Sequence, residues 1–305
     1  MKTIPNGVYP TMVTPFTEDL QVDYAAIAPL VRWYEERGVA GIFAICQSSE
    51  IFYLSFEERL QILREIMRVK QPGTVILASG HTAFDLPTQI YEAKAFIAEG
   101  IDAYVFISNR FATKQEDDDA LLLRMETVAK AVGDIPLGVY ECPYPYKRLL
   151  SPDMIRRMGE IGNFAFLKDT CCNVDEIAEK LEAAKSTGLK IFNANAAMLL
   201  DSLRLGCAGF SGIMANFHPQ LYVWLCTHWQ ENPELADRLQ NFLGMASLAE
   251  GALYPVNAKH TIALDGVPIG PYSRVKEGLL PNLNDRYVLA QLREMAQMIE
   301  KEWLV

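Results

Sequence analysis

Residues 136–168 read PLGVYECPYPYKRLLSPDMIRRMGEIGNFAFLK. Short apolar runs with β-branched or aromatic residues stand at its two ends, at 136–140 and 164–168, and both are typical of strands. Between them, Ser151 followed by Pro152 is a typical helix start, because proline at the first helical position lacks only an N–H that has no partner there. The stretch therefore predicts a strand–loop–helix–strand unit with parallel strands.

The same alternation runs along most of the chain. Six further apolar runs resemble strands, at 7–14, 41–45, 75–79, 103–107, 189–192 and 209–213. Amphipathic helical segments separate the runs, at 23–37, 55–67, 86–98, 116–132, 151–158, 174–185 and 197–205. This pattern predicts an α/β fold, a (β/α)8 TIM barrel. A doubly wound sheet usually carries a glycine-rich phosphate turn after its first strand, where this chain has Val13-Thr14-Pro15-Phe16.

The chain has 305 residues, which is compatible with two ordinary domains or with one barrel and an addition. From His218 onward the pattern is helical, interrupted by a segment rich in proline and glycine at 265–271. We therefore expect a barrel that carries the active site at 1–228, with a C-terminal helical appendage at 229–305.

Composition and charge narrow the classes of function. The 28 basic and 38 acidic residues give a net charge of −10, which argues against nucleic-acid binding. No signal peptide or membrane-length apolar segment is visible, so we expect a cytoplasmic protein without a membrane partner. The six cysteines form no C-x-x-C pair and the four histidines are scattered, so we expect no metal site.

Lys168 closes the otherwise apolar run at 164–168. Catalytic groups of such barrels lie at the carboxyl ends of strands, and burial there would lower the pKa of the lysine and leave an amine able to attack a carbonyl. Tyr140 ends the preceding predicted strand at the same rim, where its phenol could move protons. A lysine that reaches solvent and a tyrosine that caps the core are the structural alternatives.

A small polar loop follows the second predicted strand. Gln47, Ser48 and Ser49 could bind a carboxylate through hydroxyl and backbone N–H groups, although serine is also common in ordinary turns. Glu50 is expected to accept hydrogen bonds that order this loop.

Several motifs, in this order, resemble the dihydrodipicolinate synthase / N-acetylneuraminate lyase family over essentially the whole chain. The opening 7–16 is similar to the start of that family, and Cys46-Gln47-Ser48-Ser49-Glu50 is similar to its G-T-T-G-E loop. Tyr140 followed by Pro143 resembles the Y-N-x-P element, and Lys168-Asp169-Thr170 resembles the element around the imine-forming lysine. Further matches are Ala215-Asn216, Pro255-x-x-x-Lys259 and Arg274.

The resemblance implies a homo-oligomer, a dimer or tetramer, that acts as a class I aldolase or lyase on a 2-oxo acid without a cofactor. Lys168 would form an imine with pyruvate or a related carbonyl, and Tyr140 would move protons. Gln47, Ser48, Ser49 and Ser211 are the expected substrate-binding residues, together with Arg110.

Two departures weaken the lysine-biosynthesis branch of the resemblance. Pro145 stands where that branch has an arginine, and Arg110 and Phe111 replace its Tyr-Tyr pair. We therefore predict a 2-keto-3-deoxy sugar acid or a sialic-acid-like substrate, cleaved to or formed from pyruvate and an aldehyde. Dihydrodipicolinate synthase and a non-catalytic barrel that binds 2-oxo acids are the alternatives, and Arg110, Lys147 and Arg148 are open as substrate contacts.

Overall fold

Eight parallel strands form one sheet in the computed structural model, which describes residues 4–304. Their order is β1-β8-β7-β6-β5-β4-β3-β2, so strands that are consecutive in the sequence pair from β2 to β8, and β1 pairs with β8. The strands are β1 Gly7–Val8, β2 Gly41–Ile45, β3 Val75–Ala78, β4 Ala103–Ile107, β5 Leu137–Tyr140, β6 Phe164–Asp169, β7 Lys190–Asn193 and β8 Gly209–Phe210.

The segment after β1 closes the sheet onto β2. Thr11 and Phe43 form a parallel bridge, and the Phe43 N–H donates to the Pro10 carbonyl at 3.0 Å. The Ala40 N–H donates to the Val8 carbonyl at 3.1 Å, so contact with β1 begins at the residue before β2. These bonds complete the predicted barrel.

The first and last strands are shorter than the predicted runs 7–14 and 209–213. β1 has only two regularly paired residues, because Pro10 has no N–H to donate. Beyond Pro10 the chain pairs only through the bridge from Thr11 to Phe43. After β8 the chain turns at Gly212, where an added Cβ would lie 2.2 Å from the Phe210 ring and 2.5 Å from the Ala194 carbonyl. A 3-10 turn, Ile213–Asn216, takes the place of the end of the predicted strand.

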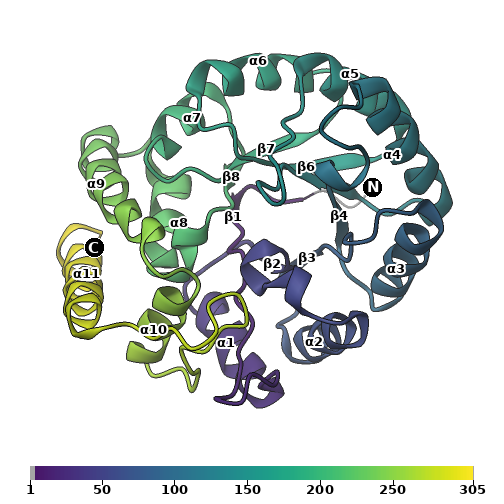
Figure 1. Cartoon of the computed structure of the whole chain (residues 1–305). Coiled ribbons are helices and arrows are strands. Elements are labelled where there is room, and N and C mark those ends of the chain that lie inside the picture. Colours follow the sequence, from purple (N-terminus) through teal and green to yellow (C-terminus); the bar gives the residue numbers. More distant parts are fainter. Residues whose placement is uncertain (1–3, 305) are drawn as a thin grey trace.

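Figure 1 shows helices around the strands, as the alternation predicts. They are α1 Ile27–Glu35, α2 Phe56–Val69, α3 Leu86–Ala98, α4 Asp118–Val132, α5 Pro152–Ile161, α6 Val174–Ala184, α7 Leu199–Leu205 and α8 Pro219–His228. The predicted starts at Ser55 and Ser151 are confirmed, because each hydroxyl accepts a hydrogen bond from a first-turn N–H. A 3-10 turn, Tyr24–Ala26, precedes α1 within the predicted segment 23–37.

The C-terminal part consists of α9 Pro233–Ala246, a 3-10 turn at Ser247–Gly251, α10 Val256–Leu264 and α11 Leu283–Trp303. In Figure 1 α9 and α11 lie outside α8, whereas α10 lies near α1. Apolar side chains of these helices share one buried cluster with Val8 and Phe210 of the barrel. The division at residue 228 stays a prediction.

Aromatic side chains fill the barrel beneath its carboxyl end. Phe166 stacks on Phe192 with ring centroids 4.7 Å apart, and Tyr9 and Phe43 meet Phe166 edge-on. Because side chains two residues apart on a strand share a face, Phe166 and Lys168 both point inward. The lysine therefore rests on an apolar floor.

No helix within residues 4–304 is both long enough and apolar enough to cross a membrane.

Candidate active site

A cavity of about 430 Å³ opens at the carboxyl ends of the strands. Its walls come from the loop after β2, from the ends of β5 and β6, from the loop after β7 and from the C-terminal part. Of the predicted site residues, Lys168, Tyr140, Gln47 and Ser48 line it. The structure thus brings together side chains that lie more than a hundred residues apart in the sequence.

Lys168 is 3% exposed and stands beside Tyr140 in the pairing of β5 with β6. Its Nζ lies 4.4 Å from the centre of the Tyr140 ring and 5.9 Å from that of Phe43. Burial lowers the pKa of Lys168, while Cys46, Cys142 and Glu250 oppose the shift. Within residues 4–304 no carboxylate forms an ion pair with this ammonium, so the pKa stays depressed and more of the amine is neutral near pH 7.

Tyr140 donates its hydroxyl proton to Gln47 Oε1 at 3.0 Å. Burial raises the pKa of Tyr140 well above its usual value, with Cys142 and Cys46 adding to the rise. The phenol is therefore protonated at neutral pH, beside the lysine amine. This pairing has the chemical form of a nucleophile with a neighbouring proton donor.

The loop after β2 forms a 3-10 turn, Gln47–Ser49, that points its first residues at the cavity. Ser48 Oγ donates to Thr11 Oγ1 at 3.0 Å and lines the cavity. Ser49 Oγ is turned into the protein, 2.6 Å from the Met12 carbonyl and 2.9 Å from the Ala44 carbonyl. The first N–H groups of such a turn have no partner within it, which leaves them free as donors.

Glu50 orders this loop, as predicted, by joining it to the C-terminal part. Its Oε1 lies 2.7 Å from Lys259 Nζ, and its Oε2 accepts from Ser273 Oγ at 3.0 Å and from the Val275 N–H at 2.9 Å. Glu50 takes a left-handed backbone conformation with φ 60°, and both charged side chains are fully buried.

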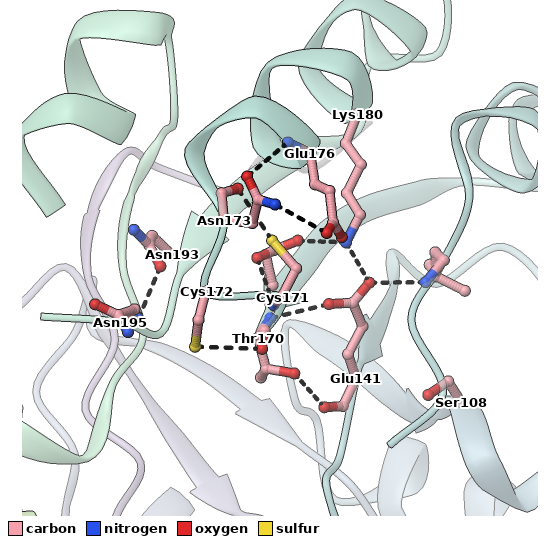
Figure 2. Close-up of polar contacts among 12 residues, drawn as sticks. Ser108, Glu141, Thr170, Cys171, Cys172, Asn173, Glu176, Lys180, Asn193 and Asn195 are labelled. Carbon is pink, nitrogen blue, oxygen red and sulfur yellow. Dashed lines mark hydrogen bonds and ion pairs between the residues drawn. The ribbon is translucent and has the colours of Figure 1, made fainter. Parts of the chain in front are cut away.

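A second buried charge network stands directly behind the two central residues. Lys180 of α6 reaches Glu141 Oε1 at 2.7 Å and Asp169 Oδ2 at 2.5 Å. Glu141 also accepts from the Thr170 N–H at 2.9 Å and the Leu150 N–H at 2.8 Å (Figure 2). Burial raises the pKa of Glu141 to about 7, Asp169 adds to the rise and Lys180 opposes it.

This network links the strand residues that follow Tyr140 and Lys168. Glu141 comes directly after Tyr140, and Asp169 comes directly after Lys168. Because the pleat sends successive side chains to opposite faces, the network fixes the two strand ends from outside the cavity.

The other predicted contacts lie elsewhere. Ser211 is buried and donates to the Tyr9 carbonyl at 3.0 Å, away from the cavity lining. Arg110 is sandwiched between Phe52 and Phe84, with its guanidinium carbon 4.5 Å from each ring centre, and does not line the cavity. Neither Ser211 nor Arg110 lines the cavity, and their substrate-binding roles stay predictions.

The two other basic residues that the sequence left undecided as substrate contacts, Lys147 and Arg148, differ in their surroundings. Lys147 lines the cavity and its Nζ donates to the Thr170 carbonyl at 2.8 Å. Arg148 instead pairs with Asp118 at 2.7 Å and donates to the Glu116 carbonyl.

The cavity or network residues that the sequence reasoning missed include Asn195, Glu250 and Lys180. Lys180 had a detectable signal, since it falls three residues after Ile177 on the inward face of the helix. Glu250 had none, because its position depends on how the C-terminal part folds back over the barrel.

Within the described part of the chain, no group of three or more histidine, cysteine, aspartate or glutamate side chains is placed to hold a metal ion. The site offers a buried amine, a protonated phenol and a polar turn after β2. This set suits the binding of a carbonyl compound that carries an adjacent carboxylate.

Known proteins of one family resemble this chain in sequence. Residues 4–280 match the model of the Dihydrodipicolinate synthetase family. An uncharacterized DapA-like lyase of Pyrococcus horikoshii is 31% identical over 225 residues, which cover 72% of this chain and 75% of the relative.

Solved structures share the fold at low identity. A chloride-inhibited dihydrodipicolinate synthase from Acinetobacter baumannii, complexed with pyruvate, is 24% identical with a TM-score of 0.86, covering 97% of this chain and 100% of that one. The sialic acid aldolase of Ruminococcus gnavus is 17% identical with a TM-score of 0.87, covering 98% of this chain and 99% of that one. At these identities the two likenesses show the TIM-barrel fold.

Proposed function

The chain belongs to the dihydrodipicolinate synthetase family, and from that premise we propose that it is a class I aldolase or lyase of 2-oxo acids. The observation that carries the proposal is the buried Lys168 amine beside the Tyr140 phenol, in a cavity at the carboxyl end of the barrel. Pyruvate is the product of cleavage or the donor in synthesis.

In the proposed cleavage, Lys168 Nζ attacks the 2-oxo carbon and a carbinolamine forms. Loss of water gives the protonated imine, which then accepts the electron pair of the breaking C3–C4 bond. The C4 hydroxyl loses its proton as the aldehyde leaves, and the resulting enamine is protonated at C3. Hydrolysis of the imine releases pyruvate and restores the amine.

Tyr140 is the proposed carrier of the protons in these steps. Its hydroxyl lies in the cavity and its raised pKa makes it a proton donor at neutral pH. The turn at 47–49 is proposed to bind the substrate carboxylate through Ser48 and backbone N–H groups, with Gln47 holding the phenol.

We favour a 2-keto-3-deoxy sugar acid or a sialic-acid-like compound as substrate. Dihydrodipicolinate synthase is the retained second function, because the family and the pyruvate-bound Acinetobacter structure carry that name. Pro145 takes the place where the resemblance expects an arginine for a second carboxylate, which favours the first choice.

Trapping with pyruvate and borohydride tests the imine. The wild-type chain should gain the mass of one reduced pyruvate, with the adduct mapped to Lys168. Lys168→Ala should show no adduct, whereas Lys147→Ala, which removes another lysine of the same cavity, should still be trapped. An adduct that forms equally in Lys168→Ala would refute the assignment. Trapping without turnover of any aldehyde or 2-keto-3-deoxy acid would support the non-catalytic alternative.

The proposal includes a homo-oligomer and a cytoplasmic location. Phe84 is 70% exposed and Tyr144 is 49% exposed, and both belong to the aromatic cluster around Arg110 and Phe52. Exposed aromatic clusters are typical of protein interfaces. Light scattering after gel filtration, compared between the wild type and Phe84→Ser, tests the assembly.

A further inference from the structure

Glu250 brings a carboxylate from the C-terminal part into the cavity of Lys168. It belongs to the 3-10 turn Ser247–Gly251, between α9 and α10. It is near enough to Lys168 for the two charges to influence each other. The reaction proposed above assigns no part to this carboxylate.

The carboxylate of Glu250 lacks hydrogen-bond donors within residues 4–304, and its Oε1 is shielded from solvent. Glu50, the other glutamate of the cavity wall, is fully satisfied by Lys259, Ser273 and the Val275 N–H. Burial raises the pKa of Glu250 to about 7, with Lys168 opposing the rise. A buried acceptor without donors is costly, so a ligand that supplies donors would be favoured here.

Two of the cations near the cavity are held by other groups. Arg110 lies between two aromatic rings and Arg148 is paired with Asp118. Lys147 is the remaining cation of the wall besides Lys168, and it donates one of its three ammonium N–H groups to the Thr170 carbonyl. A substrate carboxylate that approached Glu250 would meet a charge of its own sign.

The cavity has space for more than a three-carbon acid. Its volume of about 430 Å³ lies in the range of about 300–1,000 Å³ that is usual for small-molecule sites. Asn195, after β7, also lines this space and accepts the Met198 N–H through Oδ1, which leaves its amide N–H groups as donors. The wall therefore offers one acceptor and one donor group beyond the lysine.

We propose that Glu250 accepts hydrogen bonds from hydroxyl groups on the part of the substrate beyond its 2-oxo acid end. The site then selects uncharged polyhydroxylated chains over chains that carry a second carboxylate. The carboxylate form of Glu250 accepts hydrogen bonds from hydroxyl groups, and its charge makes these bonds stronger than those to a neutral amide. The inference rests on the proposed function for the position of the 2-oxo acid.

Pyruvate addition to two four-carbon aldehydes tests the selection. D-Erythrose is uncharged and hydroxylated, whereas succinic semialdehyde ends in a carboxylate. In the wild type we expect a higher kcat/KM for erythrose. Glu250→Gln should lower that value about tenfold or more, mainly through KM, because a hydrogen bond to a charged acceptor is lost. The same variant should raise kcat/KM for the semialdehyde.

Controls separate this inference from the proposed function. Borohydride trapping should still place one pyruvate on Lys168 in Glu250→Gln, and Glu231→Gln, at an exposed glutamate after α8, should match the wild type throughout. Calorimetric binding of D-gluconate and of adipate gives a readout that needs no imine. Gluconate should bind the wild type more tightly than Glu250→Gln does, and adipate should show the opposite order.

Two outcomes would overturn the assignment of Glu250. One is a wild type that prefers succinic semialdehyde or adipate. The other is a Glu250→Gln variant that treats both aldehydes and both acids as Glu231→Gln does. Absence of trapping in the wild type would refute the imine alone, since the calorimetric comparison still decides the role of Glu250.

Discussion

Replacing Lys259 by methionine should destabilise the chain strongly while keeping the volume of the side chain. Lys259 and Glu50 are fully buried, and their charged atoms lie 2.7 Å apart. The variant leaves Glu50 with Ser273 Oγ and the Val275 N–H but removes its ion-pair partner. Removing one partner of a buried ion pair costs about 3–5 kcal/mol.

This free energy corresponds to a measurable shift in melting temperature. An unfolding entropy of ~2.1 cal/mol/K per residue gives about 0.6 kcal/mol/K for this chain, so Tm should fall by roughly 5–8 °C. Differential scanning calorimetry measures the shift directly. The loop that carries Gln47 and Ser48 should also loosen, which would raise the KM for pyruvate.

A double variant checks the electrostatic cause. Glu50→Gln combined with Lys259→Met removes both charges, so it should recover at least half of the lost stability. A Tm within about 2 °C of the wild type for Lys259→Met would refute the reasoning, since it would imply a loss of only about 1 kcal/mol. A double variant less stable than the single one would refute it as well.

Four further predictions concern the cavity and its surroundings. Lys180→Met removes the cation between two buried carboxylates and should lower the free energy of unfolding by about 3–5 kcal/mol, together with kcat. Chemical denaturation measures the change, and an unchanged denaturation midpoint would contradict it. Lys168→Met should raise Tm at pH 7, because the lowered pKa of the lysine makes its charged form costly. That gain should fade as pH rises toward 10.5, and a gain independent of pH would count against burial as the cause. Tyr140→Phe should still be trapped by pyruvate and borohydride but turn over ~100-fold more slowly or worse, whereas equal turnover would exclude the proton-carrying role. Glu250→Gln should have the same Tm as the wild type near pH 4 and a higher Tm at pH 8. The pKa of Glu250 is raised to about 7, so the wild type loses stability as the pH rises from 4.5 to 7. A difference in Tm that does not change with pH would refute this.

Much of the fold could be predicted from the sequence because local patterns and tertiary structure agree. The alternating runs, and helix starts such as Ser55 and Ser151, each depend on neighbours within a few residues. The ends of β1 and β8 could not be placed, since Pro10 and the close approach at Gly212 act against apolar runs that look like longer strands.

The candidate site could be predicted where it follows from strand order. Lys168 and Tyr140 end adjacent strands, so their meeting follows from the barrel itself. Glu250 reaches the same cavity only through the packing of the C-terminal helices on the barrel. The helical pattern of that part predicts the helices but not how they pack. The role of Arg110 stays a prediction, and its place between two aromatic rings could not be predicted because it depends on tertiary packing.

The bond from Tyr140 to Gln47 bears on how the molecule exchanges protons with its surroundings. A hydroxyl in the place of Gln47 would accept one proton and donate another, and so extend a proton relay from Tyr140 into the loop. The amide oxygen only accepts, and an amide does not pass a proton onward at neutral pH. A proton relay through residue 47 therefore ends at its amide, and the substrate or water in the cavity that both residues line is left as the route by which Tyr140 regains a proton.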